Sequence, residues 1–250
     1  MHIQRQAFDT AGGFCTRLLD NCMELNSRDL ILSMLAEKAR VKQAVTENTN
    51  KGFAAISDAL KKLGDELRPR VTSINKSLTV EYNVKGDAEV EFSLAGDTIV
   101  FLLHGNIFTF DHNHDIWKSS YLKQDPTRAF CGQVFIYNFL TDSLKYFRGN
   151  DVGYLIARVF INKEGHYFVE GKRQLGFLYN DFSNAVFDAE QARKVVESSV
   201  IYCLDFDPFT PPYDQVGVVS VQEVMESTLR SRIATGKRLG FKFQADSDLY

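Results

Sequence analysis

The sequence lacks the features that mark several large classes of protein. Its four cysteines lack the dense spacing of a disulfide scaffold and include no Cys-x-x-Cys pair, so free thiols are expected. The longest apolar run, Ile99 to Leu103, is too short to cross a bilayer. The opening residues hold no apolar segment of the secretory kind. We therefore expect a cytoplasmic protein with no membrane partner.

Familiar catalytic and nucleotide-binding motifs are missing too. No Gly-x-Ser-x-Gly elbow and no Gly-x-Gly-x-x-Gly loop is present. The pair Gly236-Lys237 lacks both the upstream glycine and the following Ser or Thr of a P-loop. Cys131, with His166 as a distant base, is the one conceivable nucleophile, but a cysteine that heads an apolar strand is usually buried.

The chain also lacks a large excess of charge of either sign. The chain has 250 residues, 24% of them charged, and a net charge of -3, so it is not a polyanion binder as a whole. The hydrophobic fraction of 44% is ordinary for a folded protein of this length. One large domain, or one domain with an appendage, is expected.

The first third of the chain has helical periodicity. The spacing predicts helices over 14–25, 28–45 and 53–68, with a polar break at 46–50 and an end or a kink at Pro69. One stripe of the third helix alternates spacings of three and four, as in a coiled coil. This stripe is a candidate oligomer contact, or else it packs on the rest of the fold; its members are Phe53, Ile56, Leu60, Leu63 and Leu67.

The period changes to two near residue 78, which predicts an antiparallel meander. Strands are expected over 78–84, 89–94, 99–104, 107–110, 133–139, 144–147, 159–161, 166–169, 175–179 and 200–206. Residues 152–160 fit a helix or a strand. Asp188 with Gln191, and Ser220 with Glu223, are capping boxes that should open helices to about 198 and 236.

The densest polar cluster is a candidate metal site. Imidazole and carboxylate are natural zinc ligands, and alternate residues of an extended segment share a side. A plain surface loop is the competing interpretation. The candidate ligands are His104, Asp111, His112 and His114. No cofactor is favoured, and a divalent metal is the one candidate.

The C-terminal tail is locally basic, with no acidic residue between Ser227 and Ala245. Such a segment suits phosphate or an acidic partner, although cations also complement a helix C-terminus. The residues concerned are Arg230, Arg232, Lys237, Arg238 and Lys242.

These patterns predict an α+β fold. A helical arm (1–76) precedes a β-rich core of about six to nine mainly antiparallel strands (77–215), and a basic helix with its tail (216–250) packs on or beside the sheet. Without a convergent catalytic set, the leading hypothesis is a non-catalytic binding or scaffolding protein that contacts a protein partner or itself through the arm or the aromatic sheet. The alternatives are a metal-dependent hydrolase or nuclease, and a nucleic-acid-associated protein.

Overall fold

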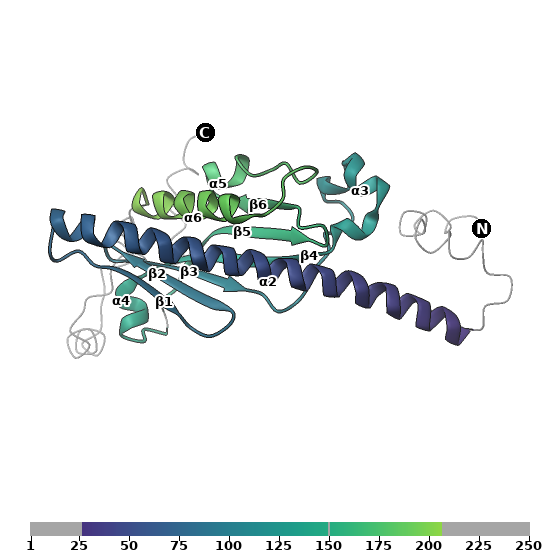
Figure 1. Ribbon diagram of the computed structural model, residues 1–250, viewed down its shortest axis with the longest axis horizontal. Coiled ribbons are helices and arrows are strands. Elements are labelled where there is room, and N and C mark those ends of the chain that lie inside the picture. Colours follow the sequence, from purple (N-terminus) through teal and green to yellow (C-terminus); the bar gives the residue numbers. More distant parts are fainter. Residues whose placement is uncertain (1–26, 150, 207–250) are drawn as a thin grey trace, which may run out of the picture.

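The computed structural model describes residues 27–149 and 151–206, which form an α+β fold (Figure 1). A long helix, α2 (Ser27–Ile74), precedes a six-stranded antiparallel sheet, and a second helix, α6 (Ala189–Leu204), follows it. The sheet is a meander in chain order, formed by β1 (Val80–Val84), β2 (Glu89–Leu94), β3 (Asp97–Leu103), β4 (Cys131–Leu140), β5 (Tyr154–Asn162) and β6 (Tyr167–Gly171). The predicted fold class is confirmed. The predicted basic helix lies outside the described residues.

Shorter elements fill the connections. Between β3 and β4 lie two 3₁₀ turns and one helix, namely η1 (Asp115–Lys118), α3 (Ser120–Gln124) and η2 (Pro126–Ala129). Helix α4 (Thr141–Lys145) follows β4, and α5 (Gln174–Phe177) follows β6. None of the helices in the described part of the chain is long and apolar enough to cross a membrane.

Helix α2 is continuous through the polar stretch where the sequence predicts a break, and it continues past Pro69, where an end or a kink is predicted. Thr46 and Thr49 donate their side-chain hydroxyls to carbonyls one helical turn earlier, at 2.9 and 2.7 Å. Asn48 donates its amide to the carbonyls of Asn162 and Lys163, where β5 turns towards β6. These polar side chains therefore bond within the helix or to the sheet, and they do not compete with the helical backbone. Pro69 lies inside the helix, which runs on to Ile74.

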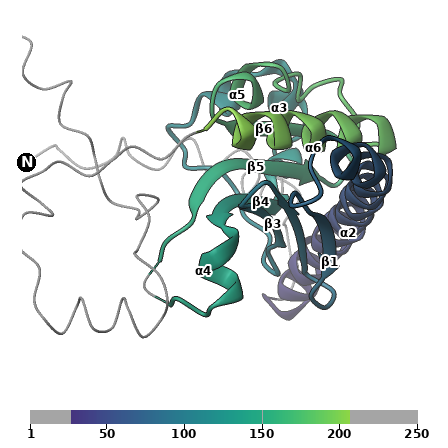
Figure 2. The ribbon, with the colours of Figure 1, turned by 90° about the vertical axis from the view of Figure 1, so that its left-hand side faces the viewer.

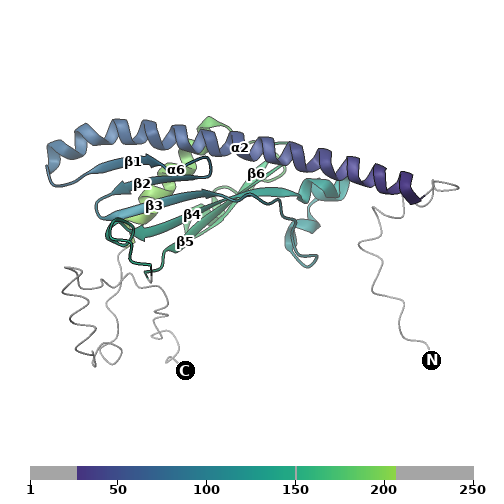
Figure 3. The ribbon, with the colours of Figure 1, turned by 90° about the horizontal axis from the view of Figure 1, so that it is seen from below.

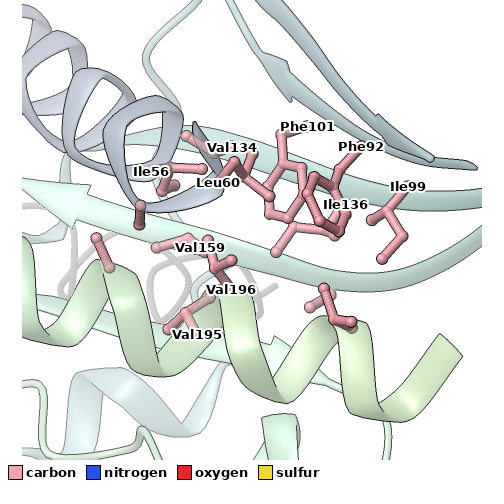
Figure 4. Close-up of a cluster of buried hydrophobic side chains, with 14 of the residues drawn as sticks. Ile56, Leu60, Phe92, Ile99, Phe101, Val134, Ile136, Val159, Val195 and Val196 are labelled. Carbon is pink, nitrogen blue, oxygen red and sulfur yellow. The ribbon is translucent and has the colours of Figure 1, made fainter. Parts of the chain in front are cut away.

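Both long helices pack against one face of the sheet (Figure 2). Alternation along each strand sends every second side chain to this face. The core contains Ile56 and Leu60 of α2, Val195 and Val196 of α6, and strand residues between them such as Phe101 (Figure 4). A bulge in the β4–β5 pairing lets adjacent β5 residues, Ile156 and Ala157, both join the core.

Helix α2 approaches the sheet closely at Gly132 in β4. A Cβ atom there would lie 2.1 Å from the Oγ1 of Thr49, so only glycine fits without displacement. On the helix side, a Cβ on Gly52 would lie 2.4 Å from the Cδ1 of Ile161. The two glycines set the short distance at which α2 crosses β4 and β5.

Several short apolar runs were assigned to the wrong element from sequence. Residues 144–147 and 175–179, predicted as strands, contribute to α4 and α5. Residues 200–206, also predicted as a strand, continue α6 to Leu204. Residues 107–110 form only a single bridge, from Phe108 to Cys131. Runs this short contain too few residues to show a period, so packing decides their conformation.

The other predicted boundaries agree more closely. Strands β1, β2, β3 and β6 fall where the period-two pattern indicates, and the ambiguous run 152–160 becomes most of β5. The side chain of Asp188 caps α6 by accepting a hydrogen bond from the backbone N–H of Gln191, at 2.8 Å, as predicted. The predicted helix over 14–25 lies outside the described residues.

Candidate functional site

The sheet face opposite α2 and α6 carries a row of aromatic side chains. In β4, Val134 and Ile136 point into the helical core, so the residues between them point the other way. Phe135 and Tyr137 stack there, with ring centroids 5.9 Å apart and an interplanar angle of 13°. Phe139 continues the row, 6.3 Å from Tyr137. All three are partly exposed to solvent.

Apolar neighbours widen this row on both sides. Leu102 of β3 pairs with Phe135, and Leu155 of β5 pairs with Tyr137, so both lie on the same face. Leu155 is 39% exposed. We refer to the resulting surface as the aromatic face, which consists of Leu102, Phe135, Tyr137, Phe139 and Leu155.

At the other end of β4 the same side of the sheet is covered. The connection between β3 and β4 folds over β5 and β6 and forms a small second core that includes Tyr121 and Phe160. Hydrogen bonds connect the side chains at the edge of this core. Tyr121 donates its hydroxyl to Glu164 at 2.7 Å, and Arg128 donates its Nε–H to the same carboxylate at 2.9 Å. Asn162, fully buried, donates to the Tyr121 hydroxyl. We interpret this network as structural, because every member has a partner.

A cavity of about 510 Å³ lies beside this second core. Its aromatic wall is formed by Phe108, Phe110, Phe160 and Phe168, which come from the β3–β4 connection and from β5 and β6. Phe160 and Phe168 stack at 4.7 Å, and the Phe110 ring lies 5.3 Å from Phe160.

Polar and charged side chains form most of the rest of the lining, among them Asp111, Arg158 and Glu170. Arg158 donates its Nε to a carboxylate oxygen of Glu170 at 2.8 Å, across the β5–β6 pair. Gln133, on the β4 strand, is 6% exposed and also lines the cavity. No described group forms a hydrogen bond with its side-chain amide.

The predicted metal ligands take up local roles instead. His104 accepts a hydrogen bond from the backbone N–H of Asn106 at its Nδ1, 3.0 Å away, and its ring packs edge-on against Phe108. His114 caps η1 by accepting from the N–H of Ile116. In both residues Nδ1 is the acceptor, which places the proton of the neutral ring on Nε2.

The other two candidates are engaged in the same segment. Asp111 accepts from the N–H of Asn113 at 2.9 Å, and His112 stacks against Trp117. The neighbouring Asp115 pairs with Lys118, whose hydrogen bond lowers the pKa of that carboxyl group. Within residues 27–149 and 151–206, no three His, Cys, Asp or Glu side chains come together in a metal-binding arrangement.

Cys131 is unsuited to nucleophilic chemistry. It is fully buried in the second core, and burial raises the pKa of its thiol, which disfavours the reactive thiolate. His166 is occupied elsewhere: its Nδ1 is 3.2 Å from the Phe182 carbonyl, and its ring stacks on Tyr121.

The coiled-coil-like stripe of α2 faces the sheet. Phe53, Ile56 and Leu60 are buried in the main core, and Leu63 and Leu67 pack against it. These side chains therefore pack on the rest of the fold, which is the second of the two interpretations of the stripe given above. The basic residues Arg230, Arg232, Lys237, Arg238 and Lys242 lie outside the described residues.

A different part of α2 is exposed. Its N-terminal end runs past the sheet (Figure 3), and Ile31, Leu32, Met34 and Leu35 are all at least half exposed there. Their spacing places them on neighbouring turns of the helix. Self-association through the arm stays a prediction, and these residues, rather than the stripe over 53–67, are the part of the arm available for it.

An aromatic sheet was expected as a contact surface from sequence, but the residues of the aromatic face were not identified and the cavity was missed. A signal for the first was present in β4, where aromatic side chains alternate with aliphatic ones from Val134 to Phe139. For Gln133 and the Arg158–Glu170 pair no local signal exists, because their proximity depends on the register of three strands. Compared with known proteins, the chain gives no significant match to a family model, a curated protein or a solved structure.

Proposed function

We propose that this chain is a non-catalytic binding protein that recognises a protein partner through the aromatic face. The observation that carries the proposal is the stacked, partly exposed row of Phe135, Tyr137 and Phe139 on the side of the sheet opposite both long helices. Aromatic residues are enriched at the centres of protein interfaces, where they bury large areas at small entropic cost.

The surroundings of the row also favour a partner. The flanking Leu102 and Leu155 are apolar, so a partner would desolvate a continuous surface rather than isolated rings. Tyr137 adds a hydroxyl, which suits a surface that is wet when free and dry when bound. The row lies on a sheet strand paired on both sides, so a partner would meet a preorganised surface.

The proposed partner can be trapped by photo-crosslinking from the face itself. Tyr137 is replaced by the photoreactive residue p-benzoylphenylalanine in the full chain, produced in its native cells. The matched control carries the same residue at Ile201, which is 59% exposed on α6. We expect irradiation to give a discrete heavier species from position 137 that is missing from position 201.

Competition makes the test specific. An excess of unlabelled wild-type chain should suppress the crosslink, whereas unlabelled Tyr137→Asp protein should not, because it places a charge at the centre of an apolar interface. The proposal fails if position 137 gives no adduct, if both positions give the same adducts, or if the Tyr137→Asp protein competes as well as the wild type.

A further inference from the structure

Gln133 is a buried amide with unused hydrogen-bonding capacity. It is 6% exposed, yet its side chain bonds to no other described group, although a primary amide offers two donors and an acceptor. The two polar atoms of the amide are not among the fully enclosed side-chain atoms of the described residues, so the amide opens onto accessible space. Because Gln133 lines the 510 Å³ cavity, the cavity is where a partner for this amide would lie.

The rest of the lining indicates the shape of that partner. The Phe110 ring packs directly on the stacked pair Phe160 and Phe168, so these rings form one aromatic wall, and flat aromatic surfaces select flat rings by stacking or edge contacts. The volume falls within the roughly 300–1,000 Å³ typical of small-molecule sites.

The charges of the lining disfavour an anionic ligand. Arg158 and Glu170 form an ion pair, so neither charge calls for a ligand of opposite sign. Asp111 adds a carboxylate to the lining and leaves it with a net negative charge when His114 is neutral. An anionic ligand would meet this charge and would also have to compete with Glu170 for Arg158.

We propose that this cavity binds a small, uncharged, planar ligand whose edge carries a carboxamide or a lactam. The amide of Gln133 forms paired hydrogen bonds with that edge, accepting from its N–H and donating to its carbonyl. The phenylalanine wall holds the ring. This site adjoins the aromatic face, because Arg158 pairs with Phe135, but it uses other side chains and does not depend on the proposed protein partner.

Benzamide and benzoate form a matched pair of probes, because they share a ring and differ in the amide and the carboxylate. Each is titrated into the full-length ¹⁵N-labelled protein, and amide shifts are followed by NMR. We expect benzamide to cause saturable shifts in the Gln133 side-chain NH₂ signal and in the backbone of β6. We expect benzoate to bind at least about tenfold more weakly, as a mismatched polar contact implies.

Variants assign the effect to the cavity. Gln133→Met keeps the side-chain length and removes the amide, and should weaken benzamide binding about tenfold. The control Gln43→Met makes the same change on the exposed surface of α2 and should leave the affinity unchanged. Phe108→Ala, at a wall residue 37% exposed, should weaken binding roughly three- to tenfold through loss of the ring contact.

Three results would overturn the proposal. The first is the absence of saturable benzamide binding up to its solubility limit. The second is benzoate binding as tightly as benzamide. The third is a Gln133→Met protein with a native amide spectrum and unchanged affinity. If Gln133→Met does not fold, an unchanged affinity in Phe108→Ala has the same consequence.

Discussion

Replacing Leu60 by alanine tests whether the apolar stripe of α2 belongs to the core of a single chain. Leu60 is fully buried between the helix and the sheet. The change removes the Cγ and both Cδ atoms, which at ~0.8 kcal/mol per buried carbon lowers the free energy of unfolding by about 2.4 kcal/mol. The cavity left behind adds to this, so the expected total is about 3–5 kcal/mol.

The loss should appear in both chemical and thermal unfolding. Followed by circular dichroism, the urea midpoint should fall with little change in the slope of the transition, and Tm should fall by roughly 6–20 °C for a chain of this size. Since the contact is intramolecular, Tm should not depend on protein concentration, whereas a subunit contact would lose stability on dilution.

Leu35→Ala is the matched control, because Leu35 lies on the same helix but is 59% exposed. It should change the unfolding free energy by no more than about 0.5 kcal/mol. The reasoning is refuted if Leu60→Ala lowers the free energy of unfolding by less than about 1 kcal/mol, or if the loss of stability grows as the protein is diluted.

Other predictions concern the helix–sheet contact, alkaline pH and thiol access. Gly132→Ala should lower the free energy of unfolding in urea by about 1–3 kcal/mol, because the new Cβ would lie 2.1 Å from Thr49 Oγ1. If the loss is just as large when Thr49 is also replaced by glycine, the clash with Thr49 is not its cause. Burial raises the pKa of Tyr167 to about 12 from 10.0, so the stability that its protonated phenol contributes is complete below about pH 10 and is lost as pH rises towards 12. Tyr167→Phe should therefore flatten the alkaline loss of stability, and a variant whose stability depends on pH as in the wild type would count against this. Cys131 should escape iodoacetamide in the native protein and react in urea, as read by peptide mass mapping, because it is buried with a raised thiol pKa; rapid native labelling would be inconsistent with the structure.

Local patterns were sufficient for much of the fold. The alternation that begins near residue 78 predicted β1, β2 and β3, because the face of each side chain follows from its neighbours in sequence. The start of α6 was equally local, since the Asp188 cap bonds an N–H only a few residues along the chain.

The histidine segment and the α2 stripe show where the same reasoning stops. Sequence spacing brought His104, His112 and His114 together as candidates, but each ring is held by a contact within its own loop. The stripe of α2 was recognised correctly, but its periodicity is the same whether the helix faces a sheet or a second copy. Periodicity reports that a face is apolar and does not report what covers it.

By itself, the sequence determined the α+β class, the meander and the caps, because these depend on interactions between residues close along the chain. Tertiary structure decided that α2 is unbroken, because Asn48 bonds to carbonyls 114 and 115 residues away. It also decided which face of β4 points away from both long helices, and that Gln133 lines the same cavity as the phenylalanine wall and the Arg158–Glu170 pair. Strand register and helix placement fix these features, and both are set by packing between distant segments rather than by any local pattern.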